Sequence, residues 1–464
     1  MNGNRKMGEM DMLHGPLLGK ILLFTLPIAL SSMLQQLFNA ADTSIVGYFG
    51  NSDALAAVGT NGEIIALIVT LSSGLSIGAN VLAASQIGKS KWNDLWETAQ
   101  TSMVLAVLIG VLGLVAGQFA ARPVLKLIQT PEEILFSAES YLRIYLLGYP
   151  FLLLYDFGAA LLRARGDSRY PFVVLVVSGA ANVFLNLLFV VVFHLNVEGV
   201  AIATDLSTMF SALMVLYRLK KDPMFHLSPG RPWIRWDYGK EILKMGIPSA
   251  IQGAVFCFAN IFVQAAVNGF GPTAIAGSTI AMNFEYFAYY GITAFGQTTT
   301  TFTSQNYAAG QIGRCRKILG ICLASSILCS LFMIVPMVLW QRTFSGLFSS
   351  DTSVIQSASV RIMCILFYEP ICSLYEIPSG TLRAAGHPVC PAVAAITGTC
   401  IFRILWICTI FQKYHTLKML YHAFPISWVL TILLVAISFA VAKPFPSAHL
   451  EKKLLAKHSN VCDK

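Results

Sequence analysis

The fold is decided by a short stretch that the chain carries twice. It reads Leu162-Arg163-Ala164-Arg165-Gly166, followed by Pro171, and it returns 220 residues later as Leu382-Arg383-Ala384-Ala385-Gly386, followed by Pro391. Outward from this stretch, nearly the same offset separates further pairs: Pro150 and Pro370, Asp156 and Glu376, Pro27 and Pro248, Asn39 and Asn260, Asn61 and Asn283, and Ser85-Gln86 and Ser304-Gln305. One such match arises easily by chance, whereas matches in the same order along both halves indicate a duplicated unit.

The composition places both copies in a membrane. Of the 464 residues 56 % are hydrophobic and only 12 % are charged, and the mean hydropathy is +0.66. A soluble globular chain has roughly 25 % charged residues. Apolar stretches near the length that spans a bilayer occur twelve times, at about 17–48, 54–87, 97–120, 134–162, 171–194, 197–218, 241–269, 273–305, 317–340, 354–382, 389–411 and 418–442.

These segments predict an all-α polytopic membrane protein with two six-helix lobes. Because six is even, both copies cross the membrane in the same sense, and a pseudo-two-fold axis along the membrane normal is expected. The predicted parts are an N-terminal segment (1–16), an N-lobe (17–219), a basic linker (220–240), a C-lobe (241–442) and a C-terminal tail (443–464). The polar start has no apolar core of the kind that a cleaved signal peptide needs, so none is expected.

Lysine and arginine set the expected orientation. They concentrate at one set of segment ends and in the linker, including Lys89, Lys91, Arg163, Arg165, Arg169, Arg314, Arg316 and Lys317. This bias places both termini and the linker in the cytoplasm of a plasma-membrane protein. The net charge of +9 therefore indicates contact with anionic membrane lipid rather than nucleic acid.

Several motifs then resemble one transporter family. They are Pro27, Phe38-Asn39-Ala40-Ala41-Asp42-Thr43, Val46-Gly47, Gly74-Leu75-Ser76-Ile77-Gly78-Ala79-Asn80, Ser85-Gln86-Ile87-Gly88 and the two copies of Leu-Arg-Ala-x-Gly. In combination they are similar to the multidrug and toxic compound extrusion (MATE) transporters. The resemblance implies a V-shaped two-lobe exporter of organic cations, driven by the entry of protons or sodium ions.

The resemblance also suggests a coupling site. Asp42 matches the family's aspartate on the first helix, which is taken as the proton or ion site of the N-lobe. Asn182 and Asn186 are spaced four residues apart and so share one helix face. The chain departs from the family at Asn186, where aspartate is frequent, and between Pro248 and Asn260, where sodium-coupled relatives carry a glutamate. Proton coupling at Asp42 is the preferred prediction and sodium the alternative, with no other cofactor and no metal site.

Other acidic residues also fall inside predicted segments, where an unpaired charge costs about 2.5 to 3.5 kcal/mol on insertion scales. Glu63, Glu285 and Glu369, with Tyr286 and Tyr290, are predicted to line a substrate cavity, although aromatic residues in helices also serve as packing. For Asp205 two interpretations stay open, a role in the cavity and a polar contact between helices. Asp156 and Glu376 lie seven residues before Arg163 and Arg383 and are expected to form structural pairs. Arg403 is the only basic residue expected deep in a segment, and Pro27 is a candidate hinge.

The predicted function is a secondary active antiporter, acting as a monomer, that exports small organic cations by alternating access. Three alternatives stay open: a lipid-linked oligosaccharide flippase of the related superfamily, a twelve-helix facilitator of another fold, and a membrane scaffold or receptor without transport. The flippase would need basic residues in the cleft, and the facilitator would show finer three-helix repeats. No phosphate-binding loop or catalytic triad is present in the sequence, so an enzyme is not expected.

Overall fold

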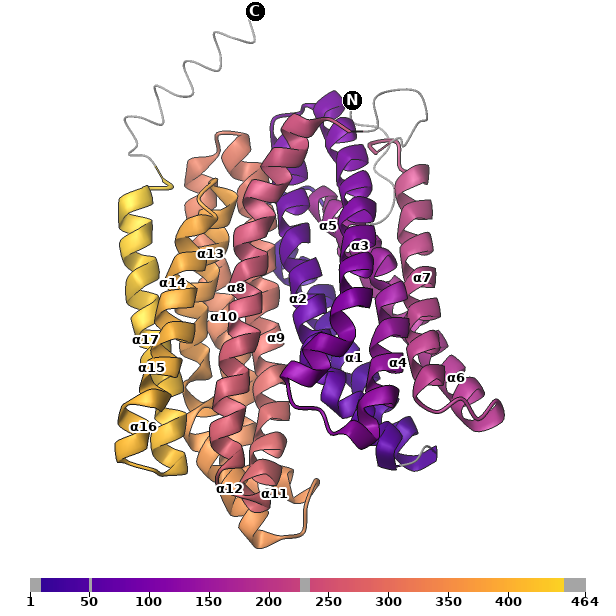
Figure 1. Ribbon diagram of the computed structural model, residues 1–464. Helices are drawn as coiled ribbons and strands as arrows, with labels where there is room; N and C mark the ends of the chain where they lie inside the picture. The colour runs from indigo at the N-terminus through magenta and orange to yellow at the C-terminus, as the bar shows by residue number, and fades with distance from the viewer. Residues whose placement is uncertain (1–9, 50–51, 226–233, 446–464) are drawn as a thin grey trace, which may run out of the picture. The chain divides into compact units, whose positions relative to one another are not determined.

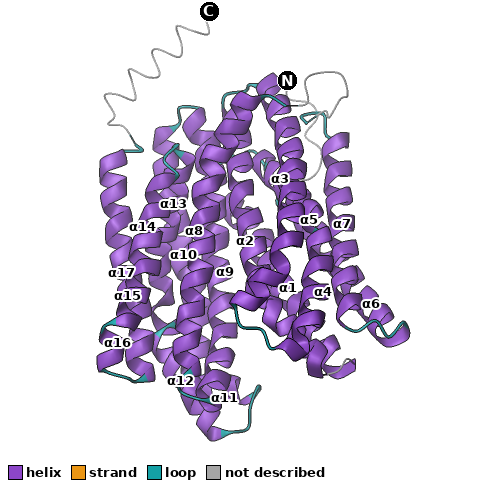
Figure 2. Ribbon diagram, in the orientation of Figure 1, coloured by secondary structure: helices purple, strands orange, loops and turns teal. Residues whose placement is uncertain are grey.

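The computed structural model describes residues 10–49, 52–225 and 234–445, and within these it contains helices and no strand (Figure 2). The described chain forms two compact units. Unit 1 holds Met10 and Leu30–Ala250, and unit 2 holds Asp11–Ala29 and the residues from Ile251 onward. The all-helical prediction is confirmed. The predicted linker and both terminal segments lie partly outside the described residues.

Unit 1 is built on the first group of helices, which Figure 1 labels. They are the later part of α1 (Leu18–Phe49), α2 (Ser52–Gly88), α3 (Trp92–Leu127), α4 (Glu132–Leu147), α5 (Tyr149–Arg165), α6 (Arg169–Leu187) with the π-helical turn η1 (Leu188–Val192), α7 (Val197–Lys221) and the first part of α8 (Trp236–Asn268). Its core is made by apolar side chains of α2, α3, α5 and α7, among them Leu95, Leu153, Phe157 and Val215.

Unit 2 contains the remaining helices. They are the start of α1, the later part of α8, α9 (Pro272–Ala308), α10 (Ile312–Leu339), α11 (Gln341–Gly346), α12 (Thr352–Cys364), the 3-10 segment η2 (Leu366–Cys372), α13 (Ser373–Ala384), α14 (Val389–Ala395), the π-helical turn η3 (Ile396–Ile401), α15 (Phe402–Cys408), α16 (Ile410–Lys413) and α17 (Leu417–Ala442). One of its cores packs Val263, Tyr375, Leu382 and Tyr421 together.

Two helices contribute to both units, and each carries a proline at the transition. In α1 the change falls between Ala29 and Leu30, shortly after Pro27, and in α8 it falls between Ala250 and Ile251, shortly after Pro248. The start of α1 packs within unit 2, where the Thr25 and Thr298 hydroxyls are 2.8 Å apart. The compact units therefore differ from the predicted lobe borders at the beginnings of these two helices.

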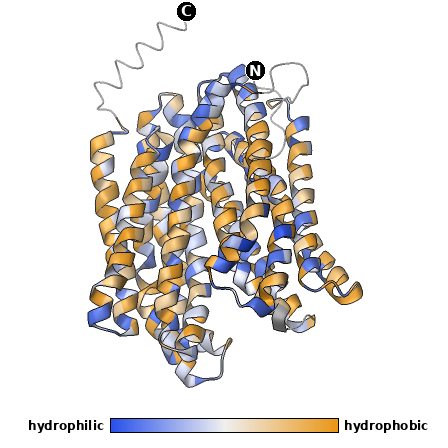
Figure 3. Ribbon diagram, viewed as in Figure 1, coloured by the Kyte–Doolittle hydropathy of each residue, from blue (hydrophilic) through white to orange (hydrophobic). Residues whose placement is uncertain are grey.

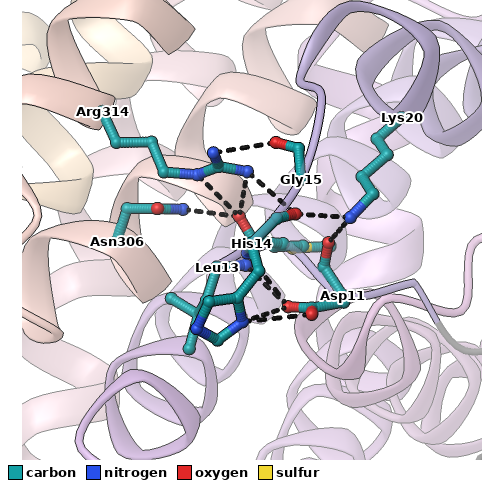
Figure 4. Close-up of polar contacts among 8 residues, drawn as sticks. Asp11, Leu13, His14, Gly15, Lys20, Asn306 and Arg314 are labelled. Carbon is teal, nitrogen blue, oxygen red and sulfur yellow. Dashed lines mark hydrogen bonds and ion pairs between the residues drawn. The ribbon is translucent and has the colours of Figure 1, made fainter.

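The segment before α1 is fixed to unit 2 through its main chain (Figure 4). The Arg314 guanidinium donates hydrogen bonds to the carbonyl oxygens of Met12, His14 and Gly15 at 3.0–3.3 Å. Asn306 donates to the Met12 oxygen at 3.1 Å, and Lys20 donates to the Asp11 oxygen at 2.7 Å. These bonds satisfy carbonyl groups that no helix satisfies, so the chain enters α1 from a defined position.

The helices have the length and surface of membrane spans. Within the described residues, ten are long and apolar enough to cross a bilayer, and α4 with α5 forms an eleventh span that bends by 44°. Figure 3 shows apolar residues along most of the helices. Many large apolar side chains are exposed, among them Phe119, Phe332 and Val441. The one remaining predicted segment, 273–305, lies in the 37-residue helix α9, which is rich in threonine and tyrosine. The chain is a multi-pass membrane protein.

Matched prolines mark breaks in both copies of the repeat. Gly148 separates α4 from α5, and Pro150 stands at the start of α5. At the equivalent place in the second copy, Pro370 lies in the 3-10 segment between α12 and α13. Proline lacks the N–H that a continuous helix needs, so the two breaks follow from the duplicated sequence.

Glycines allow α8 to lie directly against α2 within unit 1. A side chain at Gly74 would collide with the backbone of Ala250, and one at Gly78 would collide with the Ile242 carbonyl. Gly246 of α8 faces the backbone of Leu75 in the same way. Small residues at such spacing are the usual means by which membrane helices approach closely.

This contact predicts a position-specific loss of stability. The substitution Gly78→Val should destabilise the protein by about 1–3 kcal/mol, because the new methyl groups would force α2 and α8 apart. Gly59→Val lies on the same helix, has no atom within 4 Å of the added Cβ, and serves as the control. Melting temperatures of the two purified variants in detergent measure the difference. Equal melting temperatures would show that α2 and α8 do not pack this closely.

Candidate functional site

A polar cluster in unit 1 brings three helices together around Asp42. The Asn186 amide of α6 donates a hydrogen bond to the Asp42 carboxylate of α1 at 2.5 Å. Asn186 also donates to the Asn182 oxygen at 3.3 Å, and Asn182 donates to the Thr204 hydroxyl of α7 at 3.4 Å. The structure thus brings Asp42, Asn182 and Asn186 into one hydrogen-bonded chain and adds Thr204 to it.

Among the described residues, the Asp42 carboxylate accepts a hydrogen bond from one amide, that of Asn186, and forms no ion pair with a base. Asn186 is fully buried and Asn182 nearly so, whereas Asp42 is half-buried. No lysine or arginine pairs with Asp42 in the part of the chain that the structure describes. The Asn186 side-chain oxygen has no hydrogen-bond partner among the described residues. Carboxylate, amide and hydroxyl oxygens are the ligands that hard cations prefer, so the cluster can hold a proton or a small cation.

Tyrosines of α4 border this cluster, and the sequence analysis did not select them. The Tyr141 and Tyr145 rings stack with centroids 6.3 Å apart. Both lie within electrostatic range of Asp42 and of Asp205, which is on α7 beside the Gly148 backbone. Their four-residue spacing was the signal that could have identified them, since it places them on one face.

Glu63 and Glu285 occupy equivalent positions in the repeat but have different surroundings. Glu63 is exposed on α2, and no ion pair involves it in the described residues. Glu285 is buried on α9, where its carboxylate accepts two hydrogen bonds from Arg361, both at 2.8 Å. Arg361 also donates to the Ser278 hydroxyl at 2.6 Å.

The expectation that only Arg403 lies deep among the basic residues is therefore wrong. Arg361 is 4 % exposed and lies ten residues into the 33-residue span from Thr352 to Ala384. A two-pronged bond to Glu285 and the nearby ring of Tyr421 stabilise its charge there, as guanidinium and carboxylate geometries allow. The Glu285 carboxylate is consequently neutralised inside unit 2.

Glu369 and Arg403 are two buried charged groups of unit 2 that have unsatisfied atoms and no ion pair among the described residues. Glu369 lies in η2, and its Oε2 atom has no hydrogen-bond partner among the described residues. Arg403 donates to Ser427 at 3.1 Å and lies 3.9 Å from the Phe424 ring centroid, while its Nη1 atom has no partner among those residues. Tyr286 and Tyr290 stack with centroids 6.2 Å apart on α9.

Glu376 and Asp156, the other pair of acids at equivalent positions in the repeat, both form side-chain hydrogen bonds. Glu376 accepts a hydrogen bond from Arg383 at 2.9 Å, which is the expected structural pair. Its counterpart Asp156 accepts a hydrogen bond from the Ser72 hydroxyl at 2.6 Å and lies within electrostatic range of Arg163. The second copy therefore forms a direct ion pair where the first uses a hydroxyl.

Comparison with known proteins decides the family. The model of the MatE family matches residues 27–188 and 248–408, so the two matched stretches begin at Pro27 and Pro248. The chain belongs to the MATE family.

Relatives and solved structures agree with this assignment. The chain is 26 % identical to a probable multidrug resistance protein, YoeA, of Bacillus subtilis, over 81 % of this chain and 82 % of the relative. It is 28 % identical to the probable multidrug resistance protein NorM of Thermotoga maritima, over 81 % of each. A MATE transporter solved in an outward-facing conformation has a TM-score of 0.85 at 20 % identity, over 95 % of this chain and 100 % of that one.

A second solved structure shares the fold. It is a MOP superfamily transporter from Pyrococcus furiosus, described as having a binding pocket of reversed polarity that suggests a different function. It covers 95 % of this chain and 98 % of its own, with a TM-score of 0.84 at 20 % identity. The MATE chain therefore has the two-lobe, twelve-helix fold that was predicted, while the polarity of its site must be judged from its own residues.

The Glu285 and Arg361 pair predicts a non-additive effect on stability. Glu285→Gln should destabilise the MATE chain by about 3–5 kcal/mol, because Arg361 would stay buried without its counter-charge. Adding Arg361→Gln should recover much of this loss, since both charges are then absent. Thermal unfolding of the single and double variants measures the recovery. Losses that simply add would show that the two groups do not interact.

Proposed function

We propose that this MATE transporter is a plasma-membrane antiporter that exports small organic cations in exchange for protons by alternating access. The observation that carries the proposal is Asp42, a carboxylate inside a membrane unit whose described contacts are with amides and not with a base. A carboxylate inside a membrane costs free energy, so its presence there indicates a function. The names of the relatives, which are multidrug resistance proteins, support export of drugs.

Proton exchange at Asp42 accounts for its surroundings. The carboxyl binds a proton when it faces the outer medium and releases it when the cycle exposes it to the cytoplasm. The amide of Asn186 stabilises the ionised form by donating a hydrogen bond, while partial burial stabilises the protonated form. A group balanced between these effects can change its protonation during the cycle.

The free energy released by one proton is enough to drive export of one cargo molecule through a single coupled site. One proton moving down 100 mV releases about 2.3 kcal/mol, which sustains roughly a 50-fold gradient of cargo. Pro27 stands next to the point where α1 passes from unit 2 to unit 1, and it is proposed as the hinge that carries a change at Asp42 along the helix. The transporter is proposed to act as a monomer, because each chain holds both units.

Cargo recognition is proposed for acidic and aromatic side chains of unit 2, with Glu63 considered separately because it belongs to unit 1. Glu63 is exposed, and Glu369 keeps one unsatisfied oxygen, whereas Arg361 already neutralises Glu285. The stacked pair of Tyr286 and Tyr290 offers ring faces that attract organic cations. Within unit 2, Glu285 is therefore proposed to contribute as a residue paired with Arg361, and Glu369 to supply negative charge.

Arg403 favours a second candidate, transport of an anionic lipid-linked oligosaccharide. A flippase needs a basic residue for the diphosphate, and Arg403 has one unsatisfied N–H group within unit 2. The larger number of acidic residues in the predicted membrane segments weighs against this candidate. An assay in vesicles that contain the protein separates cation export from lipid-linked oligosaccharide transport. It measures transport of a fluorescent cation and, separately, of a lipid diphosphate.

The substitution Asp42→Asn tests the coupling. It keeps the size of the side chain but cannot titrate, so the variant should bind ethidium and lose efflux driven by a proton gradient in proteoliposomes. Asp237→Asn, an exposed change at the start of α8, is the control and should keep full efflux. Efflux by Asp42→Asn at the wild-type rate under a proton gradient would refute the assignment. Efflux of the wild type under a sodium gradient alone would select the sodium alternative.

The orientation is tested by cysteine labelling in intact cells. Lys221→Cys, at the end of α7, should resist an impermeant maleimide, because the basic residues place this end in the cytoplasm. Asn196→Cys, in the exposed turn before α7, should react. Labelling of the unsubstituted protein measures the background reaction of the native cysteines. The reverse pattern would invert the membrane orientation and the direction of export.

A further inference from the structure

The segment from Asp11 to Gly15 forms a compact bend before α1 (Figure 4). The Asp11 carboxylate accepts hydrogen bonds from the main-chain N–H groups of Leu13 and His14 at 3.0 and 3.2 Å. Lys20, in the first turn of α1, donates to the carbonyl oxygens of Asp11 and His14 at 2.7 and 2.5 Å. Gly15 has a φ of +75°, a conformation that glycine adopts without strain. The segment is therefore bonded to the helix that it precedes.

Two side chains of unit 2 hold this segment from the other side. The Arg314 guanidinium, at the start of α10, donates to the carbonyl oxygens of Met12, His14 and Gly15 at 3.0–3.3 Å. Asn306, which is fully buried near the end of α9, donates to the Met12 oxygen at 3.1 Å. A guanidinium presents several N–H groups in a fixed geometry, so one side chain binds three carbonyl groups. We call Arg314 and Asn306 the dock.

The start of α1 also packs along the helix that carries Asn306. The Phe24 ring meets the Phe302 ring edge-on, with 5.4 Å between their centroids. The Thr25 hydroxyl is 2.8 Å from the hydroxyl of Thr298. Thr298, Phe302 and Asn306 are four residues apart in turn, so one face of α9 carries both contacts and part of the dock. The start of α1 is thus bound at its end and along its side.

The remainder of α1 carries the residue that is proposed to exchange protons. It belongs to unit 1 from Leu30 onward and includes Asp42, while Pro27 lies between it and the docked start. Proline removes one hydrogen bond of the helix and makes this the place where bending costs least. When the start is fixed, a change at Asp42 has to bend the helix. When the start is free, movement of the whole helix absorbs the same change.

The dock occurs in one copy of the repeat. The matched Ser-Gln pairs near the ends of α2 and α9 set the offset between the copies at this place. At that offset Asn306 and Arg314 correspond to Ile87 and Leu95. These apolar side chains have no N–H group to donate to a main-chain oxygen. The dock is therefore an addition to the duplicated scaffold, and it holds the helix that carries Asp42.

We propose that Arg314 and Asn306 are positioning residues for transport, which hold the start of α1 so that a change of protonation at Asp42 bends this helix at Pro27. The proposal rests on the proposed function, in which Asp42 exchanges a proton and Pro27 is the hinge. The dock acts through α1 and contacts neither the proton nor the cargo. Loss of the dock therefore weakens coupling and leaves cargo binding intact.

Thiol labelling measures whether the dock holds α1. Thr25→Cys places a thiol of similar size at a position that is 3 % exposed, and mass spectrometry of its peptide separates it from the native cysteines. In the purified transporter with this change, Arg314→Gln should raise the rate of maleimide labelling on the order of tenfold or more, because opening of the start exposes the thiol. Gly15→Val should act alike from the other side of the contact, since valine is strained at a φ of +75°.

Two transport modes separate positioning from a purely structural role. Ethidium efflux driven by a proton gradient needs a change at Asp42 to be passed along α1, whereas exchange of ethidium across proteoliposomes at equal pH does not. Without Thr25→Cys, both Arg314→Gln and Gly15→Val should lower driven efflux on the order of fivefold or more, as loss of coupling between two sites does. Exchange should continue at the wild-type rate.

Lys317→Gln is the matched control. It removes a basic charge from an exposed position of α10, three residues after Arg314. It should leave the labelling rate at position 25 and both transport modes unchanged. Asp42→Asn, measured in the same transport assays, reports on the proposed function by itself.

Each result has a defined meaning. Faster labelling and reduced driven efflux with retained exchange, in both Arg314→Gln and Gly15→Val, support the proposal. Wild-type labelling in both variants overturns it, because the dock then does not hold α1. Faster labelling with wild-type driven efflux overturns the positioning role, and inactivity of Asp42→Asn then leaves the proposed function in place. Equal loss of both transport modes marks a purely structural role and overturns the proposal as well. Full driven efflux by Asp42→Asn instead refutes the proposed function.

Discussion

The structure is constrained by the free-energy cost of keeping charged side chains inside a membrane. A carboxylate or guanidinium there is retained only if a partner or a polar surrounding stabilises it. In unit 2 this condition is met by direct ion pairs, between Glu285 and Arg361 and between Glu376 and Arg383. In unit 1, Asp42 and Asp156 are instead contacted by an amide and a hydroxyl, which do not fix their protonation. The proposed function therefore places proton exchange at Asp42 of unit 1 and gives the ion pairs of unit 2 a structural role.

Duplication explains the architecture, and divergence of the two copies explains the site. The prolines at 27 and 248 stand beside the transitions of α1 and α8 between units, and those at 150 and 370 stand at the helix breaks. The acids diverged: Glu63 is exposed while its counterpart Glu285 is paired, and Asp156 lacks the direct ion pair that Glu376 makes. The two copies therefore share a scaffold but differ in the partners of their acidic side chains.

The sequence predicted the helices and the repeat because apolar length and repeated prolines are local signals. It also predicted that Asn182, Asn186 and Asp42 belong together, through helical spacing and family resemblance. It could not place Arg361, because a basic residue ten positions into a segment is read as interfacial unless its partner is known. Glu285 is 76 positions away along the chain, and only packing brings the two together.

The central claim is that cargo and a proton compete through Asp42. The most direct measurement is calorimetric titration of the purified transporter with ethidium in two buffers of different ionisation enthalpy, which counts the protons released as cargo binds. For the wild-type protein the account predicts release of about one proton per cargo bound at a pH where Asp42 is protonated, by linkage. It predicts no release from Asp42→Asn. Equal release from both proteins would contradict the account.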